Sequence, residues 1–485
     1  MRADRMRLPA LKRVTRAWRC AVLTGAMGLS MTACSSPGTY MNQPLRSLAP
    51  PAQSSSISVG GYRRGQLASA DARPDILVAL AFSGGGKRSA AFSYGVLRGL
   101  RDFHIDYHGD RSLLQIVDVI SSVSGGSFTA AYYGLFHDRI FTDYETDFLK
   151  RDIEAYIYGT YLLPWEWRWM FDPRYGTNDR MAEIYDQTMF HGATYADLIT
   201  KGLPLISIDA TDINYGTVFP FNQDQFDLIC SDLTSFPVAR AVAASNGFPV
   251  IFAPVNLIDY AKDCAPRMPR WVLQAQSAPS LSREGNLARI ARLYLDPGKT
   301  SYIHLMDGGI SDNLAMRGMI NSVLSYSTDL AAYQSAVIHF RRILVVSVDG
   351  EAAANSSWPK QESISSMGQI FQAVSGSQID AYNFETLVLA KDLVATFVDD
   401  IRDARCRRSA IIDGIPCNDV RGYLVHLSLD DIADSAVRRR LQSIATGLTI
   451  PDGDVDLLVK AGETAVRDSA QLKNFRREIE SRPAS

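Results

Sequence analysis

Three glycine-rich stretches, at residues 83–88, 122–126 and 307–309, each follow an apolar run of β-strand length. The first run, residues 76–82, is apolar throughout, which is typical of a strand covered on both faces. After its glycines, apolar side chains recur between residues 91 and 100 at the spacing of one helix face. A strand, a tight turn and a helix in succession favour a parallel sheet, because parallel neighbours need a crossover that is usually helical.

The same alternation continues along the chain. We expect further strands at residues 116–120, 203–208, 217–221, 302–306 and 343–348, and helices at 127–136, 238–245 and 313–324. Beyond about residue 355 the pattern becomes mainly helical, with 441–446 and 455–468 as examples. The predicted fold class is α/β, with a mostly parallel central sheet flanked by helices and a mainly helical C-terminal extension.

Residues 1–33 have the pattern of a secretory signal peptide, with a basic start, a short uncharged stretch and small residues before Cys34. The uncharged stretch is too short to span a bilayer. Thr32-Ala33-Cys34 resembles a bacterial lipobox, in which Cys34 is lipidated and becomes the new N-terminus. We expect export and a lipid anchor on the bacterial cell envelope, at the outer membrane. An ordinary cleaved signal with an incidental cysteine is the alternative.

Residues 34–73 are rich in Ser, Pro, Ala and Gly, which predicts a flexible tether between the anchor and a folded body. No later segment is apolar and long enough to be a transmembrane helix.

The charge of the chain is unevenly distributed. Residues 1–33 carry seven of the 50 Lys and Arg residues but one of the 52 Asp and Glu residues, so the remainder has a formal net charge of −8. A body this acidic has no global attraction for nucleic acid or anionic lipid. We therefore expect no nucleic-acid partner, and only local, largely apolar membrane contact beyond the anchor.

Four cysteines follow Cys34, and an even number in an exported protein favours disulfides. Nearest-neighbour pairing gives Cys230–Cys264 and Cys406–Cys417, although four cysteines allow three connectivities. No Cys or His spacing indicates zinc, and we expect no metal and no cofactor.

Ser124 lies between a predicted strand and a predicted helix, within the sequence Ser122-Val123-Ser124-Gly125-Gly126. A strand–Ser–helix elbow exposes the serine Oγ and points the next backbone N–H, here that of Gly125, at the oxygen of a reacting carbonyl. Ser122 stands where the elbow pattern has its first glycine. Because clusters of Ser and Gly also form ordinary turns, the elbow alone is weak evidence for a nucleophile.

The glycine triplet Gly84-Gly85-Gly86 separates a predicted strand from a predicted helix. Free backbone N–H groups at a helix start can hold an anion. The spacing fits neither a P-loop nor a dinucleotide-binding fingerprint. An oxyanion hole or a tight turn without function both remain possible for this triplet taken alone.

Asp307 follows a predicted strand and precedes two glycines. Carboxylates at such strand ends often act on ligands, although an Asp-Gly turn explains the pair equally well in isolation. None of the seven histidines lies in an obvious triad loop, and we expect His304, within a strand, to be a packed core residue. Direct proton transfer from Ser124 to Asp307 therefore fits the sequence better than a histidine base.

Taken in order, the Gly-Gly-Gly-Lys-Arg, Val-Ser-Gly-Gly-Ser and Asp-Gly-Gly motifs resemble the patatin-like phospholipase family. Residues 241–252, with an Ala-Ser pair followed by Phe-Pro and a later Phe, resemble the helix-to-strand segment of that family. The resemblance covers roughly residues 76–315. Ser89 stands where the glycine loop of the family often has another glycine, and Arg88 matches its basic position, which we interpret as structural.

The resemblance implies a Ser124–Asp307 catalytic dyad, an oxyanion hole at Gly84, Gly85, Gly86 and Gly125, and an acyl-enzyme intermediate. It also implies hydrolysis of carboxylic esters in lipids, with phospholipid or lysophospholipid as substrate and no metal requirement. On this basis residues 74–350 form the acyl hydrolase domain, and residues 351–485 form a mainly helical C-terminal region.

One short interval is unusually aromatic and could be a lid or a lipid-docking surface, or an insertion packed on the α/β body. Its aromatic residues are Tyr156, Tyr158, Tyr161, Trp165, Trp167, Trp169 and Phe171. Two alternative functions stay open from sequence: a catalytically silent lipoprotein that binds lipid or protein in the same cleft, and a hydrolase of soluble esters or peptides.

Overall fold

The computed structural model describes ten segments of the chain. They are residues 42–45, 62–63, 75–161, 176–249, 252–264, 268–279, 281–327, 337–351, 367–412 and 414–481. The predicted signal peptide and Cys34 lie outside these residues. No helix among the described segments has the length and apolar character needed to cross a membrane.

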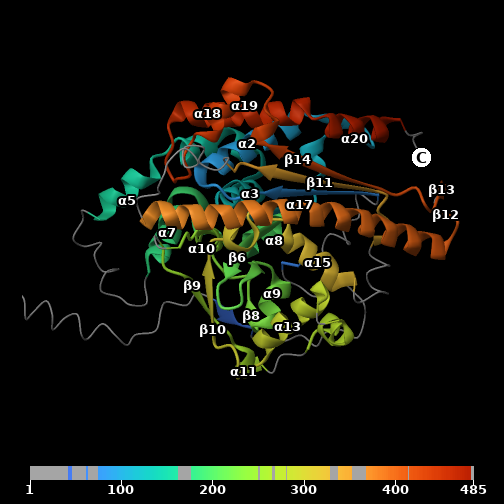
Figure 1. Cartoon of the computed structure of the whole chain (residues 1–485), viewed down its shortest axis with the longest axis horizontal. Helices are drawn as coiled ribbons and strands as arrows, with labels where there is room; N and C mark the ends of the chain where they lie inside the picture. The colour runs from blue at the N-terminus through green and yellow to red at the C-terminus, as the bar shows by residue number, and fades with distance from the viewer. Residues whose placement is uncertain are drawn as a thin grey trace, which may run out of the picture.

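The described residues form a central sheet of eight strands in the order β14-β11-β2-β5-β6-β10-β9, with β7 paired to β6 (Figure 1). Their bounds are β2 (Ile76–Phe82), β5 (Val119–Val123), β6 (Leu205–Asp212), β7 (Thr217–Pro220), β9 (Val255–Ile258), β10 (Tyr302–Met306), β11 (Arg342–Asp349) and β14 (Arg421–Ser428). The five strands from β14 to β6 are parallel, whereas β10, β9 and β7 pair antiparallel. The predicted mostly parallel sheet is confirmed.

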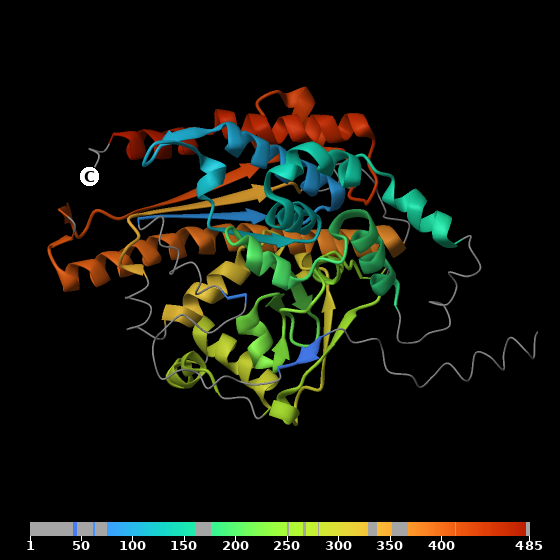
Figure 2. The ribbon, with the colours of Figure 1, turned by 180° about the vertical axis from the view of Figure 1, so that it is seen from behind.

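Helices cover both faces of the parallel strands. Helices α2 (Gly86–Asp102), α3 (Gly125–Phe136) and α19 (Asp452–Asp468) pack together, and the long helix α17 (Met367–Arg408) contacts β14. Figure 2 shows β2, β11 and β14 side by side, with α19 on one side of them and α17 on the other. Both faces are thereby shielded, which explains why β2 reads as one continuous apolar run.

Two glycines let α19 lie close against α2. A Cβ on Gly95 would come within 2.1 Å of the Val459 carbonyl oxygen, and a Cβ on Gly462 within 2.4 Å of the Phe92 carbonyl oxygen. Any larger residue at either position would push the two helices apart. Helix α19 therefore packs directly on α2, the helix that begins at the glycine triplet.

The remaining elements surround this framework. They are β1 (Gln43–Pro44), β3 (His104–Asp106), β4 (Asp110–Ser112), α4 (Ile140–Tyr144), α5 (Ile153–Tyr161), α7 (Thr177–Tyr185), α8 (Tyr195–Lys201), α9 (Gln223–Leu228), β8 (Ser231–Asp232), α10 (Val238–Ser245), α11 (Ala261–Cys264), α12 (Arg270–Gln274), α13 (Arg283–Leu295), α14 (Gly309–Asp312), α15 (Arg317–Ser327), β12 (Ile411–Ile412), β13 (Ile415–Pro416), α18 (Ser435–Gln442) and α20 (Ala470–Glu480). Single helical turns of 3₁₀ or π type join several of them.

Strand β14 departs from the mainly helical pattern expected beyond residue 355. It pairs in parallel with β11 along its whole length, from Arg421 opposite Arg342 to Ser428 opposite Asp349. The strand forms an edge of the sheet, and only Val425 and Leu427 are fully buried. An edge strand with so few buried positions leaves a weak apolar pattern. Strands β12 and β13 also interrupt the helical pattern. The predicted helix at 455–468 lies within α19, but the one at 441–446 is wrong, because α18 ends at Gln442.

The predicted strand at 116–120 begins three residues later than expected. Residues 113–116 form a 3₁₀ turn, because the Ser112 hydroxyl accepts the Gln115 N–H while the Gln115 side chain accepts the Ser112 N–H. This reciprocal cap stabilises a helical turn that includes Ile116, the first residue of the predicted strand.

Two pieces of the predicted tether pack on the body of the protein. Strand β1 pairs antiparallel with β8. Tyr62 is buried against Tyr195, and Arg63 forms ion pairs with Asp224 and Asp227. The prediction of a flexible tether is therefore wrong for residues 42–45 and 62–63. At the second of these positions the Tyr62 ring is buried in the body of the protein. The rest of the tether lies outside the described residues.

The predicted Cys406–Cys417 disulfide is confirmed. It joins the end of α17 to the segment just before β14. Cys230 is also disulfide-bonded. The side chain of Cys264, its predicted partner, lies outside the described part of the structure.

Candidate active site

Ser124 lies on a tight turn between β5 and α3. Its backbone adopts φ 48° and ψ −122°, a conformation that non-glycine residues rarely take. A Cβ on Gly125 would lie 2.0 Å from the Gly86 carbonyl oxygen, so only glycine fits after the serine. The Ser245 hydroxyl accepts the Ser124 N–H at 2.9 Å and donates to the Asp209 carbonyl at 2.6 Å. This contact fixes the turn that carries the serine.

The structure brings Ser124 and Asp307 into direct contact. Ser124 Oγ donates a hydrogen bond to Asp307 Oδ2 at 2.9 Å, and both side chains are buried. Asp307 follows β10, where the Gly309 N–H binds its other oxygen at 2.8 Å and the Thr211 hydroxyl binds its carbonyl at 2.8 Å. The carboxylate is therefore held by its own Asp-Gly-Gly turn while facing the serine.

Burial raises the pKa of Asp307 from 3.8 to about 6, while the hydrogen bonds from Gly309 and Ser124 work in the opposite direction. A carboxyl group with a pKa near 6 is ionised at neutral pH but is a stronger base than an exposed one. It is therefore suited to accept a proton from a serine hydroxyl.

Asn246 also touches the serine, and sequence reasoning missed it. Ser124 Oγ lies 3.1 Å from Asn246 Oδ1, and Asn246 Nδ2 lies 3.2 Å from the Tyr185 hydroxyl. One hydroxyl carries one hydrogen, so Ser124 cannot donate to Asn246 and Asp307 at the same time. If the amide turns by 180°, Asn246 donates to Ser124 and Tyr185 donates to Asn246, which directs the serine hydrogen to Asp307. The only sequence signal was the position of Asn246 directly after the Ala-Ser pair.

The glycine triplet faces the same turn, but its members are not equivalent. The Gly84 N–H donates to the Asn313 carbonyl at 2.9 Å, so it is already used to hold the loop. Gly85 and Gly86 adopt positive φ of 129° and 60°, which favours glycine. Among the described residues, no acceptor is present for the N–H groups of Gly85, Gly86 and Gly125. These three are the donors available for an oxyanion, and the expected contribution of Gly84 is not supported by this geometry.

Two of these glycines also begin helices. Gly86 is the first residue of α2 and Gly125 is the first residue of α3. The positive ends of two helix dipoles therefore converge beside Ser124, which favours negative charge at this point.

Part of the chain is similar to one protein family. A model of the Patatin-like phospholipase family matches residues 80–320, about half of the chain. Residues 80–320 belong to the patatin-like phospholipase family. No curated protein matched the chain.

The search of solved structures found human GIVD cytosolic phospholipase A2, with a TM-score of 0.44 and 11% identity over 86% of this chain. The same enzyme in complex with methyl gamma-linolenyl fluorophosphonate gave a TM-score of 0.40 and 13% identity over 84% of this chain. The chain spans 65% and 59% of the length of these two structures.

The C-terminal region supports the glycine loop of the patatin-like domain. The Lys87 N–H donates to the Gly447 carbonyl at 2.9 Å. Arg88 donates from Nε to the Gly350 carbonyl at 2.8 Å and from Nη1 to the Ile444 carbonyl at 2.7 Å. Burial lowers the pKa of Arg88 to about 10, which leaves it charged at neutral pH. Its partners are backbone carbonyls outside residues 80–320, which supports the structural interpretation of Arg88.

A buried carboxyl group lies behind the same loop. Asn313, whose carbonyl holds Gly84, donates from Nδ2 to Glu351 at 2.9 Å, and Asn383 of α17 donates to the same oxygen. Burial, followed by the charges of Asp349 and Asp380, raises the pKa of Glu351 to about 8. Glu351 thus connects α17 to the glycine loop, a role that no local sequence pattern indicates.

Other predicted features lie elsewhere. His304 is half-buried and pairs with Asn214 at 3.0 Å, so it is neither a core residue nor a partner of Ser124. Tyr156 packs against the core, whereas the side chains of the other six aromatic residues of the 156–171 interval lie outside the described residues. Within the described segments, no group of three or more His, Cys, Asp or Glu side chains forms a possible metal site.

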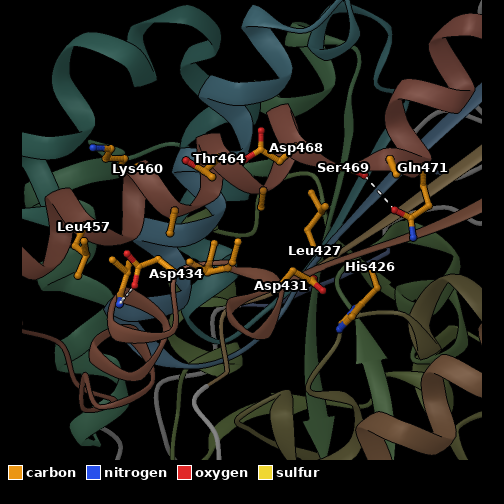
Figure 3. Close-up of a pocket in the computed structure, with 16 residues that line it drawn as sticks. His426, Leu427, Asp431, Asp434, Leu457, Lys460, Thr464, Asp468, Ser469 and Gln471 are labelled. Atoms are coloured by element: carbon orange, nitrogen blue, oxygen red, sulfur yellow. Dashed lines mark hydrogen bonds between the residues drawn. The ribbon is translucent and has the colours of Figure 1, made fainter.

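One cleft lies away from the dyad. It has a volume of about 450 Å³ and lies between β14, α18, α19 and α20 (Figure 3). Asp434 on its wall caps α18 by accepting the N–H groups of Ala436 and Val437, and Asp431 accepts the Ser428 N–H. These acidic side chains therefore stabilise local turns, and the cleft lining includes neither Ser124 nor Asp307.

Proposed function

We propose that this protein is a lipid acyl hydrolase of the phospholipase A or lysophospholipase type, which uses Ser124 as nucleophile and Asp307 as general base. The main support is the 2.9 Å hydrogen bond between Ser124 Oγ and Asp307 Oδ2 beside free glycine N–H groups. The family of residues 80–320 supports the ester-hydrolase chemistry and a phospholipid substrate.

In the proposed first half-reaction, Asp307 accepts the Ser124 proton as Oγ attacks the ester carbonyl carbon. The negative charge that develops on the carbonyl oxygen is stabilised by the N–H groups of Gly85, Gly86 and Gly125. The tetrahedral intermediate then collapses, the carbon–oxygen ester bond breaks, and protonated Asp307 returns the proton to the leaving alkoxide. The acyl group remains as an ester on Ser124.

In the second half-reaction, Asp307 accepts a proton from a water molecule that attacks the acyl carbonyl carbon. The same N–H groups stabilise the second tetrahedral intermediate. Collapse breaks the Oγ–acyl bond, returns the proton to Ser124 and releases the fatty acid. With its amide turned so that Nδ2 donates to Ser124 Oγ, Asn246 keeps the serine hydrogen directed at Asp307 between turnovers.

Product analysis by mass spectrometry tests this proposal. Wild type, Ser124→Ala and Asp307→Asn are each incubated with phospholipid and lysophospholipid vesicles, with exposed Ser301→Ala and Asp106→Asn as matched controls. We expect free fatty acid and the deacylated lipid from wild type and both controls, and from neither dyad variant. Fatty acid release that survives in Ser124→Ala would contradict the proposal, and lipid binding without hydrolysis by wild type would favour a silent binding protein.

We also propose, from the sequence alone, that Cys34 carries lipid and attaches the protein to the bacterial cell envelope. Expression of the full chain in a bacterial host, followed by mass spectrometry of the mature N-terminus, tests this. We expect a diacylated cysteine that is lost in Cys34→Ser. An unmodified N-terminus at another residue would contradict it.

A further inference from the structure

A second cleft borders α14, the short helix that begins two residues after Asp307. It has a volume of about 260 Å³ and is lined by residues of β7, α13, α14, α15 and α17. Its α14 wall is Ile310 and Ser311, which directly follow the Asp307-Gly308-Gly309 turn. The Ser311 hydroxyl lies 2.8 Å from the Thr211 hydroxyl, and that hydroxyl binds the Asp307 carbonyl. The cleft and the proposed base are therefore held by the same short helix.

The lining of this cleft is strongly basic. It includes Arg283, Arg289 and Arg317, and it contains no Asp or Glu from the described residues. Arg283 and Arg289 are exposed on α13, and Arg317 is half-buried at the start of α15. In the described part of the chain none of the three guanidinium groups forms a salt bridge. This concentration of positive charge contrasts with the formal net charge of −2 of the whole chain.

The half-buried arginine of the cleft, Arg317, is fixed in place. Arg317 Nε donates to the Thr386 hydroxyl of α17 at 2.8 Å, and its guanidinium lies 4.6 Å from the centre of the Tyr382 ring. Its backbone N–H donates to buried Asp312, whose pKa is raised to about 7 by burial and by the charge of Asp209. Asp312 accepts the backbone N–H of Arg317, not its guanidinium group. Within the described residues the Arg317 Nη groups form no hydrogen bond, so they are available to an anion.

These features match a phosphate group. Guanidinium groups bind phosphate oxygens through paired, charge-assisted hydrogen bonds, and lining Asn and Tyr side chains can donate further ones. The volume is smaller than that of typical pockets for drug-sized ligands, so it suits a head group better than a whole lipid. Ile310, 45% exposed, lies on the α14 wall and offers an apolar surface beside the polar one.

From this geometry we infer that the Arg283–Arg289–Arg317 cleft is a binding site for the phosphate of a phospholipid substrate whose ester reaches Ser124. The inference rests on the proposed function. Free inorganic phosphate has the same recognition chemistry, and the experiment separates the two sources. The site explains how an acidic protein could select phosphate-bearing lipids over neutral ones.

The kinetic test compares two substrates with identical acyl chains, a phospholipid and a diacylglycerol, in neutral detergent micelles. The variant is Arg283→Gln/Arg289→Gln, because both side chains are exposed, and the matched control is Arg407→Gln/Arg467→Gln on distant helix surfaces. We expect kcat/KM for the phospholipid to fall roughly tenfold or more, equivalent to about 1.4 kcal/mol, with diacylglycerol hydrolysis and the control unchanged. An equal loss on both substrates, or no loss on either, would overturn the inference.

A binding test separates this inference from the proposed function. In a Ser124→Ala background, binding to phospholipid micelles is measured with and without the Arg283→Gln/Arg289→Gln changes, so that no turnover is needed. We expect roughly tenfold weaker binding with the changes, and inorganic phosphate should compete with micelles of the unchanged background. In one outcome, the arginine changes weaken the binding of inorganic phosphate but not the binding to micelles. That result would identify a site for free phosphate and overturn the head-group assignment. A wild type that hydrolyses no ester but shows the arginine-dependent binding would refute only the proposed function.

Discussion

Replacing Asp307 with Asn should make the protein more stable at alkaline pH while it removes activity. Burial raises the pKa of Asp307 from 3.8 to about 6. The folded protein therefore binds this proton more tightly than the unfolded chain does, so ionisation at high pH weakens the fold. Asn has nearly the same shape, can still accept the Gly309 N–H and carries no charge to bury.

The magnitude follows from the pKa difference. A shift from 3.8 to about 6 is about 2 units, and each unit corresponds to about 1.4 kcal/mol, so the ionised carboxylate costs the fold about 3 kcal/mol. This cost is absent below pH 3.8, grows between pH 3.8 and 6, and is complete above pH 6. The advantage of Asp307→Asn should follow the same window, reaching about 3 kcal/mol at pH 8 and falling to about 0.5 kcal/mol at pH 4.

Urea unfolding followed by tryptophan fluorescence measures this difference at both pH values. Other buried carboxyl groups titrate equally in wild type and variant, so their contributions cancel. Exposed Asp106→Asn serves as the control and should change stability little at either pH. Equal stability of wild type and Asp307→Asn at pH 8, or an advantage that does not depend on pH, would refute the reasoning about the buried base.

Three further results are expected. The kcat/KM for a p-nitrophenyl ester should rise with pH through about 6, since only ionised Asp307 accepts the proton; a flat profile between pH 5 and 7 would argue against this base. Asn246→Ala should lower kcat by roughly tenfold with little change in KM, because the Ser124 hydrogen is no longer directed; an unchanged kcat would remove Asn246 from the site. Loss of the Cys406–Cys417 disulfide in a double Ser variant should cost about 3 kcal/mol of unfolding free energy, given its separation of 11 residues, and leave activity intact; an unchanged urea midpoint would contradict this.

Much of the sheet could be predicted from the sequence because its strands are buried on both faces. The expected strand at 76–82 coincides with β2, six of whose seven residues are buried. The less buried strand at 302–306 and the helix at 238–245 coincide with β10 and α10. Strand β14 was missed because it lies at the edge of the sheet, where few positions are buried. The 3₁₀ turn at 113–116 was missed because a side-chain cap, rather than the apolar pattern, determines it.

Some residues of the proposed site could likewise be predicted from the sequence, and others could not. Ser124 and Asp307 could be predicted because each follows a strand and precedes glycines. This local pattern is weak alone, but the order of the three glycine-rich motifs along the chain resembles one family. Asn246 could not, because its role depends on contacts with residues more than 60 positions away. Glu351 could not be predicted either, because it accepts hydrogen bonds from Asn313 and from Asn383 of α17, which are distant in sequence. The hydrogen bond from the Gly84 N–H to the Asn313 carbonyl is also a tertiary contact.

Covalent labelling of the nucleophile tests the central claim most directly. The full chain is treated with a long-chain alkyl fluorophosphonate, which phosphonylates an activated serine and releases fluoride, and the adduct is mapped by peptide mass spectrometry. The account predicts one adduct, on Ser124, which is absent in Ser124→Ala and strongly slowed in Asp307→Asn. An adduct on a different residue, or labelling of Asp307→Asn at the wild-type rate, would contradict the dyad.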